Sequence, residues 1–216
     1  MRLRVFFLAA TAALATTSGY AEDARLSGMG ANIFGNSFFH FSEANLKAPP
    51  VTSINVGRMR VLLQQTKLSE LRKVFGGTIY QQGVEHNAAY WLCYTTDGSK
   101  GQAATVWFLS NSLGGGDFVM MVAAEAASAR GGSGDCSPAP AVFSVPDMGI
   151  PGIGATTADL KAHFGAATVG SHSTVSYRSD RPAKDGLGTA QNAQYIGYIV
   201  RGGVVTGVGV GETSTQ

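Results

Sequence analysis

A segment that recurs 89 residues apart constrains the fold more than any other feature of the chain. The later copy, at 152–177, has a glycine-containing approach, two threonines, a short amphipathic helix that ends in Phe-Gly, and an alternating strand. The matching positions are Glu70 and Asp159, Leu71 and Leu160, Phe75 and Phe164, and Gly76 and Gly165. We therefore expect two related half-domains, each organised around one of these helices.

Strand patterns follow both helices. Aromatic and β-branched runs at 89–95, 104–109 and 118–122 follow the first helix, and runs at 174–177, 195–200 and 204–210 follow the second. Glycine-containing turns separate them, which is typical of antiparallel meanders. The predicted fold class is α+β, with two tandem half-domains that each pack a short helix on an antiparallel sheet.

The helix ends carry specific signals. Thr156 and Asp159 form a capping-box pattern at the start of the second helix, and Gly165 ends that helix. The first helix is predicted to open at Thr66. The apolar side of the second helix is predicted to comprise Leu160, His163 and Phe164.

Glycine and small polar residues predict where regular structure is absent. We expect a flexible lead-in at 27–30, loops at 123–134 and 179–191, and a frayed tail from 212 onward. In the last strand, Gly207 and Gly209 leave one face bare, so a neighbouring group can approach closely there.

The first 21 residues have the pattern of a cleavable export signal. Arg2 and Arg4 precede an apolar run of about ten residues, too short for the roughly 20 residues that span a bilayer. Gly19 and Ala21 suit the cleavage site, so we predict a cut after Ala21. No cysteine for lipid attachment lies near the cut, and no later run is long enough for a transmembrane segment. A periplasmic or secreted protein is predicted.

The remaining chain divides into an aromatic-rich arm at 22–53 and repeats at 54–145 and 146–216. Arg2 and Arg4 belong to the leader, so the 16 basic and 14 acidic residues of the whole chain become 14 of each. A neutral chain gives no electrostatic argument for nucleic acid or an anionic membrane. The aromatics at 32–41 are expected to lie on the body of the protein or to pair as a strand.

The two cysteines, Cys93 and Cys136, allow one intramolecular pairing. In an exported chain a structural disulfide is the favoured interpretation, with a metal pair or a reactive thiol as alternatives. By the chain-entropy relation, closing a loop of roughly 40 residues contributes on the order of 3–4 kcal/mol.

Aromatic residues concentrate on two predicted strands. Alternation places Tyr90 and Tyr94 on one face and Trp91 on the other, with Trp107 on the next strand. One face must cover the helix, and the other is a candidate binding platform, because exposed aromatics are typical of binding surfaces. The alternative is that both tryptophans pack in the core. The candidate binding residues are Tyr90, Trp91, Tyr94 and Trp107.

The repeat pattern resembles that of β-lactamase-inhibitor-protein-like domains and of the small outer-membrane-assembly lipoproteins of the SmpA/OmlA type. The residues that carry the resemblance are Gly154, Thr156, Leu160, Phe164, Gly165 and Tyr177 in the second half, and Thr66, Leu71, Phe75, Gly76 and Tyr90 or Tyr94 in the first. The resemblance implies tandem α/β units whose sheet face binds another protein without catalysis. The chain departs from the lipoproteins because it lacks the lipid-attachment cysteine.

A catalytic signature is absent from the sequence. His40, His86, His163 and His172 are scattered, with no metal-binding spacing, and no phosphate-binding loop or nucleophile elbow is present. We therefore expect a non-enzymatic protein-binding domain without metal or cofactor. The alternative is an exported hydrolase whose site assembles from dispersed residues, for example His86 or His172 with an acid.

Overall fold

The computed structural model describes residues 24–35, 44–98, 102–127, 135–165, 173–182 and 191–215, so the predicted export signal lies outside the described residues. The helices are α1 (Gly28–Phe34), α2 (Leu68–Phe75) and α3 (Thr157–Phe164), with a 3-10 turn, η1, at Glu85–Asn87. The strands are β1 (Ile54–Val56), β2 (Met59–Val61), β3 (Tyr80–Gln82), β4 (Ala89–Thr95), β5 (Ala104–Asn111), β6 (Met121–Ala126), β7 (Ser137–Pro138), β8 (Thr174–Pro182), β9 (Gln191–Arg201) and β10 (Val204–Thr215). The predicted α+β fold class is confirmed.

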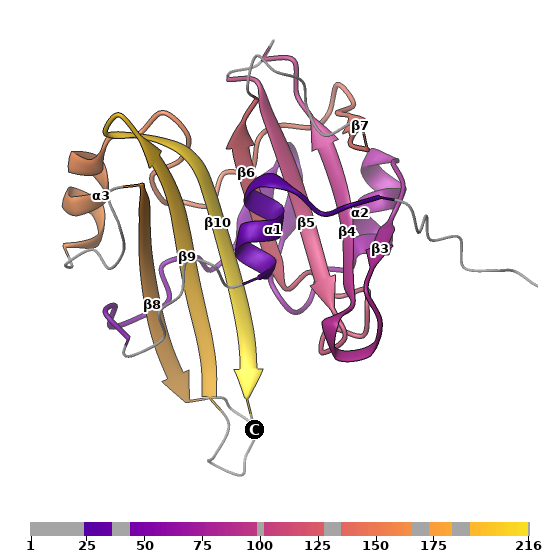
Figure 1. Cartoon of the computed structure of the whole chain (residues 1–216), viewed down its shortest axis with the longest axis horizontal. Helices are drawn as coiled ribbons and strands as arrows, with labels where there is room; N and C mark the ends of the chain where they lie inside the picture. Colours follow the sequence, from indigo (N-terminus) through magenta and orange to yellow (C-terminus); the bar gives the residue numbers. More distant parts are fainter. Residues whose placement is uncertain are drawn as a thin grey trace, which may run out of the picture.

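One largely antiparallel sheet runs through both halves of the chain (Figure 1). Its strands follow the order β3-β4-β5-β6-β10-β9-β8, and β7 runs parallel to β4. The pairing of β6 with β10, for example Ala124 opposite Val208, joins the sheets of the two halves. β1 and β2 form a separate hairpin that turns at Gly57-Arg58, as predicted. The superposition of 54–145 on 146–212 stays a prediction.

The capping box of α3 is confirmed. The backbone N–H of Thr156 donates to the Asp159 carboxylate at 2.7 Å, and the Asp159 N–H donates to Thr156 Oγ1 at 3.2 Å. Gly165 ends the helix in the left-handed region with φ of 60°. The hydrogen bonds from the Thr156 backbone, and then from its hydroxyl, lower the pKa of Asp159.

The predicted start of α2 needs a small correction. The helix begins at Leu68, because the Thr66 side chain is occupied one turn earlier, where Oγ1 accepts the Leu62 N–H at 2.9 Å. The Lys67 N–H instead donates to the Glu70 carboxylate at 3.1 Å. A carboxylate therefore occupies the positive end of both helices.

α2 and α3 lie on the same face of the sheet, and each ends in a phenylalanine that packs on a sheet tyrosine. The ring centroids of Phe75 and Tyr94 are 6.1 Å apart, and those of Phe164 and Tyr177 are 4.0 Å apart. The Tyr94 hydroxyl donates to the Gly76 carbonyl at 2.7 Å, and burial raises the Tyr94 pKa. Tyr94, rather than Tyr90, thus marks the helix contact in the first half.

The two helices are not equally buried. In α2, Leu68, Leu71 and Phe75 are buried, whereas in α3 only Leu160 is. Phe164 is half-buried and His163 is exposed, so the predicted apolar side of α3 is wrong at His163. The reason is geometric. At about 100° per residue, His163 and Phe164 flank Leu160 on either side of the helix surface, and α3 turns the Phe164 side toward the sheet.

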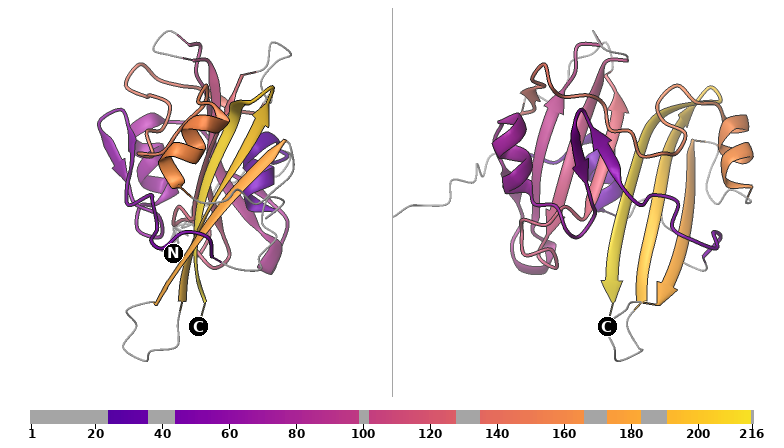
Figure 2. Two further views of the ribbon diagram at one scale, coloured as in Figure 1. Left: turned by 90° about the vertical axis from the view of Figure 1, so that its left-hand side faces the viewer. Right: turned by 180° about the vertical axis from the view of Figure 1, so that it is seen from behind.

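α1 covers the other face of the sheet, as the edge-on view in Figure 2 shows. Met29 and Ile33 are fully buried there, and a Cβ at Gly209 would lie 3.1 Å from both side chains. The predicted close approach to the glycine face of the last strand is therefore confirmed, with α1 as the approaching group. The Met29 N–H donates to Glu125 Oε2 at 2.9 Å, which fixes the start of the helix.

The prediction of a flexible lead-in at 27–30 is wrong, because this stretch opens α1. Gly30 lies directly on the indole of Trp107, and a Cβ there would approach the ring to 2.8 Å. The glycine is thus required by close packing rather than by flexibility. The aromatics at 36–41 lie outside the described residues.

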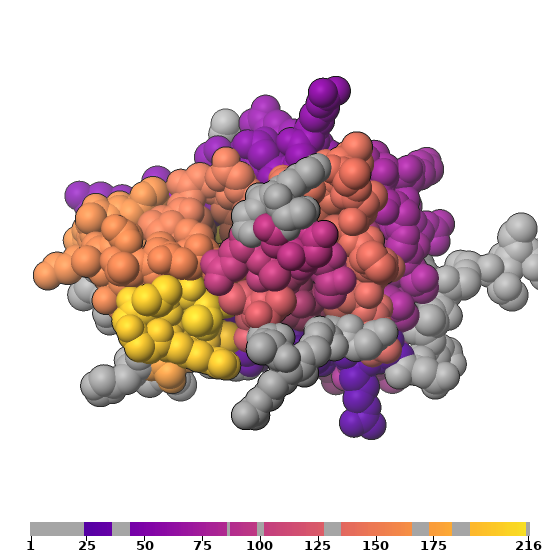
Figure 3. Space-filling model, turned by 90° about the horizontal axis from the view of Figure 1, so that it is seen from above, coloured from indigo at the N-terminus to yellow at the C-terminus, as the bar shows by residue number. Residues whose placement is uncertain are grey.

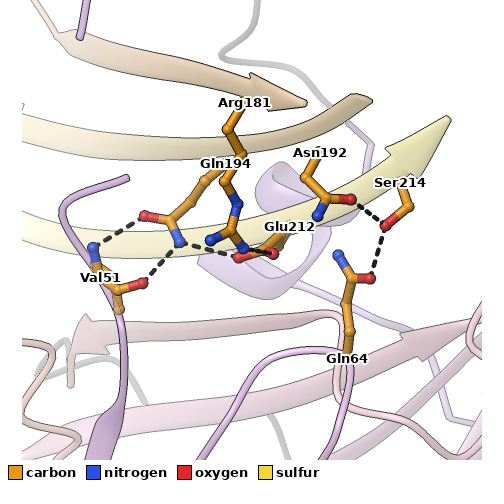
Figure 4. Close-up of polar contacts among 7 residues, drawn as sticks. All are labelled: Val51, Gln64, Arg181, Asn192, Gln194, Glu212 and Ser214. Atoms are coloured by element: carbon orange, nitrogen blue, oxygen red, sulfur yellow. Dashed lines mark hydrogen bonds and ion pairs between the residues drawn. The ribbon is translucent and has the colours of Figure 1, made fainter. Parts of the chain in front are cut away.

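The next part of the arm passes the edge strand and crosses to the α2/α3 face. At the β8 edge, the Arg178 N–H donates to Asn45 Oδ1 at 2.8 Å, while the Asn45 and Leu46 N–H groups donate to the Arg178 carbonyl. Further on, the Val51 backbone is hydrogen-bonded to the side chain of Gln194 (Figure 4). Backbone hydrogen bonding at the β8 edge is thus met partly by the protein's own arm.

Three predicted irregular stretches contain strand residues. β6 continues to Ala126, because Ala123 is small enough to lie opposite Trp107 in the β5–β6 ladder. β8 extends to Pro182 and β10 to Thr215. The tail does not fray at Glu212, whose carboxylate accepts a hydrogen bond from Arg181 at 2.6 Å and is largely buried.

Candidate binding site

The predicted aromatic platform is not an exposed surface. The exposed fractions are 2% for Trp91, 0% for Tyr94 and 4% for Trp107, and Tyr90 is half-buried. The predicted alternation of Tyr94 and Trp91 is correct, since they belong to the cores on opposite faces. The platform prediction fails because α2 covers one face and α1 covers the other.

The predicted disulfide is present. Cys93 in β4 and Cys136 just before β7 are bonded, with their Cα atoms 4.7 Å apart across 43 residues of sequence. The bond brings Ser137 beside Tyr94 and Pro138 beside Thr95 in the short parallel pairing of β7 with β4. It therefore fixes the start of the segment that leads from the first half to the second.

The histidines provide no described site. His163 is exposed on α3, with its ring 4.8 Å from that of Phe164. His40 and His172 lie outside the described residues, and for His86 only the backbone in η1 is described. Across the described ranges, no three or more His, Cys, Asp and Glu side chains are grouped so as to hold a metal ion.

A cleft of about 350 Å³ opens at the end of the sheet where β4 turns into β5. Residues 95–98 and Gln102 line one side, and the segment that follows the disulfide lines the other. Figure 3 looks down on this end of the molecule, with the described residues between β4 and β5 in magenta beside the coral segment around 138–150. The lining residues are Thr95, Thr96, Asp97, Gly98, Gln102, Pro138, Ala139, Pro140, Ala141, Phe143, Ser144 and Val145.

The second wall is held in place from several sides. The Ala139 N–H donates to the Thr95 carbonyl at 2.9 Å, directly after the disulfide. Phe143 is buried against Tyr94 and Phe75, with ring centroids 4.9 and 5.1 Å away. The Ser144 hydroxyl accepts the Gly57 N–H at 2.7 Å, which ties the wall to the β1–β2 turn. This wall of the cleft is therefore pre-formed.

The outer surface of this wall is apolar. Val142 is 63% exposed although its neighbour Phe143 is buried, and its carbonyl packs directly over Gly57. Gly57 has a φ of 60°, and any side chain there would overlap that carbonyl. The hairpin turn thus supports the wall from behind and leaves the Val142 side chain facing outward.

Two smaller cavities lie elsewhere among the described residues. One, of about 170 Å³, lies under the arm beside Arg181 and Glu212, whose charges pair with each other. The other, of about 220 Å³, lies between Met148, Ile150 and β10. The cleft of about 350 Å³ is larger than either and has the exposed Val142 beside it, so it is the better candidate.

No family model, curated protein or solved structure matches this chain. In the described ranges, no helix is long and apolar enough to cross a membrane.

The cleft was not predicted from the sequence, although the segments that line it have recognisable sequence features. Asp97-Gly98 was visible as a turn, Pro138 and Pro140 as a break, and Cys136 as the anchor between them. What was missing was the parallel pairing of β7 with β4, which brings the two walls together. Short parallel pairings have no periodicity of their own in the sequence.

Proposed function

We propose that this chain is an exported, non-enzymatic protein-binding domain that acts in the periplasm or outside the cell, in or near the envelope. Its export signal directs it to an oxidising compartment, where a disulfide such as Cys93–Cys136 persists. Its binding surface is the cleft together with the exposed Val142 beside it.

The single observation that supports this proposal most is the contrast between Val142 and Phe143. Adjacent residues of one restrained segment are 63% and 4% exposed, so an apolar side chain is held outward on a rigid base. Rigid, exposed apolar groups beside a pocket are typical of the centre of protein interfaces, because little conformational entropy is lost on binding.

Site-directed photo-crosslinking tests the proposal. A photoreactive residue at Val142 should form a discrete adduct in the envelope of the producing cell, and an excess of the unmodified protein should compete it away. The matched control is Val74, which is 53% exposed and lies on a different element, α2. Equal adducts from both positions, or none from Val142, would reject the proposed surface.

Cleavage after Ala21 is a separate part of the proposal. Purified protein from the cell exterior or periplasm should begin at Glu22 by N-terminal sequencing. An intact Met1 terminus on protein retained in the cytoplasm would exclude export.

A further inference from the structure

Two tyrosine hydroxyls in the second half of the sheet are buried without a hydrogen-bond partner among the described residues. Tyr177 in β8 is 1% exposed and Tyr198 in β9 is 0% exposed. They lie on the same face of the sheet, because Tyr198 is opposite Val175, two residues before Tyr177. Each hydroxyl has given up hydrogen bonds to water and gained none from the protein, which costs free energy.

The tyrosine that contacts the helix end in the first half differs in this respect. The Tyr94 hydroxyl donates to the carbonyl of Gly76 at 2.7 Å, directly after Phe75 at the end of α2. This bond fastens the C-terminal end of α2 to the sheet. In the part of the chain that the structure describes, no tyrosine hydroxyl fastens the end of α3 in the same way.

The N-terminal end of α3 is tied to the turn between β9 and β10 by its backbone. The Thr157 N–H donates to the Gly203 carbonyl at 3.1 Å, and the Val205 N–H donates to the Ala155 carbonyl at 2.8 Å. Backbone hydrogen bonds of this kind hold the start of the helix at a fixed place on the sheet.

The C-terminal end of α3 contacts the sheet through side chains. Leu160 is the one residue of α3 that is fully buried. The ring of Phe164 is only half-buried, and its centroid lies 4.0 Å from that of Tyr177 and 6.1 Å from that of Tyr198. Phe164 thus covers the two tyrosines without satisfying their hydroxyls.

We infer that α3 is a lid, hinged at Thr157, that opens at its Phe164 end. Opening brings the hydroxyls of Tyr177 and Tyr198 into water and so removes the cost of their missing hydrogen bonds. The open state of α3 is therefore closer in free energy to the closed state than that of α2. Opening exposes an aromatic sheet surface with two hydroxyl groups, which Phe164 covers in the closed state. This inference is independent of the proposed binding cleft.

Amide hydrogen exchange of the full-length, isotope-labelled protein, followed by NMR, tests the inference. An eight-residue helix is too short to persist away from the sheet, so the amides of α3 exchange whenever the lid opens. The amides of 161–165 should be at least about fivefold less protected than those of 72–76 in α2, which has the same length. The Val205 amide at the hinge should be more protected than 161–165.

Three tyrosine variants make the test specific. Tyr177→Phe and Tyr198→Phe keep the ring and remove the hydroxyl, so opening no longer gains its hydration. Each should raise the protection of 161–165 by at least about fivefold, the factor expected for one unpartnered buried hydroxyl. Tyr94→Phe is the matched control, because it removes a hydroxyl that has a partner. It should lower the protection of 72–76 and leave that of 161–165 unchanged.

Unchanged resonance dispersion in all three variants verifies that each one folds. Unchanged or lowered protection of 161–165 in both Tyr177→Phe and Tyr198→Phe would overturn the inference. It would mean that the two hydroxyls have partners in the closed state, such as internal water. Equal protection of 161–165 and 72–76 in the unaltered protein would also overturn it, because α3 would then leave the sheet no more readily than α2.

Discussion

Gln194 holds the backbone of Val51 with both ends of its side-chain amide. The Val51 N–H donates to Gln194 Oε1 at 2.9 Å, and Gln194 Nε2 donates to the Val51 carbonyl at 2.7 Å. The same Nε2 contacts Glu212 at 3.1 Å, and Glu212 pairs with Arg181 (Figure 4). A buried amide thus replaces a neighbouring strand for a segment 143 residues away in sequence.

Replacing Gln194 with alanine should destabilise the protein by about 2–4 kcal/mol, because the Val51 backbone and Glu212 would lose buried partners. Urea unfolding measures this cost. Asn192→Ala on the same strand is the control, since the Asn192 side chain accepts a hydrogen bond from the exposed Ser214, and it should cost less than about 1 kcal/mol. Equal losses of unfolding free energy in the two variants would show that the hydrogen bonds between Gln194 and Val51 do not stabilise the fold.

Two of the glycines in β10, Gly207 and Gly211, should respond differently to replacement by alanine. A Cβ at Gly211 would overlap the buried ring of Tyr195, so Gly211→Ala should destabilise by about 1–3 kcal/mol. At Gly207 the nearest atom, in Ile199, is 3.4 Å away, so alanine fits and should be neutral or slightly stabilising. Thermal unfolding of both variants compares them directly, and a larger cost at Gly207 would contradict the packing of this face.

The disulfide should contribute on the order of 3–4 kcal/mol, because it closes a loop of 43 residues in the unfolded chain. Alkylation of the denatured, unreduced protein should add no mass. The double variant Cys93→Ala/Cys136→Ala should unfold at lower urea and exchange its 137–145 amides faster. Two alkylated cysteines in the denatured, unreduced protein would exclude the bond.

The two helix-ending phenylalanines should differ in cost. Phe75 is 6% exposed and contacts both Tyr94 and Phe143, so Phe75→Ala should cost about 3–5 kcal/mol. Phe164 is half-buried with its ring stacked on Tyr177, and Phe164→Ala should cost about 1–2 kcal/mol. Chemical denaturation measures the loss of unfolding free energy in each variant. Equal losses would mean that α3 is as firmly packed as α2.

The cap of α3 should depend on pH. Hydrogen bonds from Thr156 hold the Asp159 pKa below its ordinary value of 3.8, so the cap stabilises the folded state fully above that value. This contribution is lost as the pH falls through the lower, folded-state pKa. NMR titration of the Asp159 carboxyl should give this low pKa, and Thr156→Ala should raise it toward 3.8. An unchanged pKa in that variant would show that the Thr156 hydroxyl does not contribute, since the backbone N–H at position 156 still donates to Asp159.

Local chemistry in the sequence determined the short-range features. The Thr156–Asp159 box, the Gly165 stop and the turn at Gly57-Arg58 each involve neighbours within a few residues, so local residue preferences suffice to place them. The Cys93–Cys136 pairing was also determined, because two cysteines permit only one internal bond.

Only the tertiary structure decided which surfaces remain exposed. Alternation showed that Trp91 and Tyr94 lie on opposite faces, but not that Met29 and Ile33 of a glycine-rich stretch would cover the tryptophan side. Glu212 is buried because Arg181 and Gln194 meet it across the sheet, against its own preference for water. The cleft likewise exists because distant segments are brought together, and such long-range contacts leave no periodic trace in a single sequence.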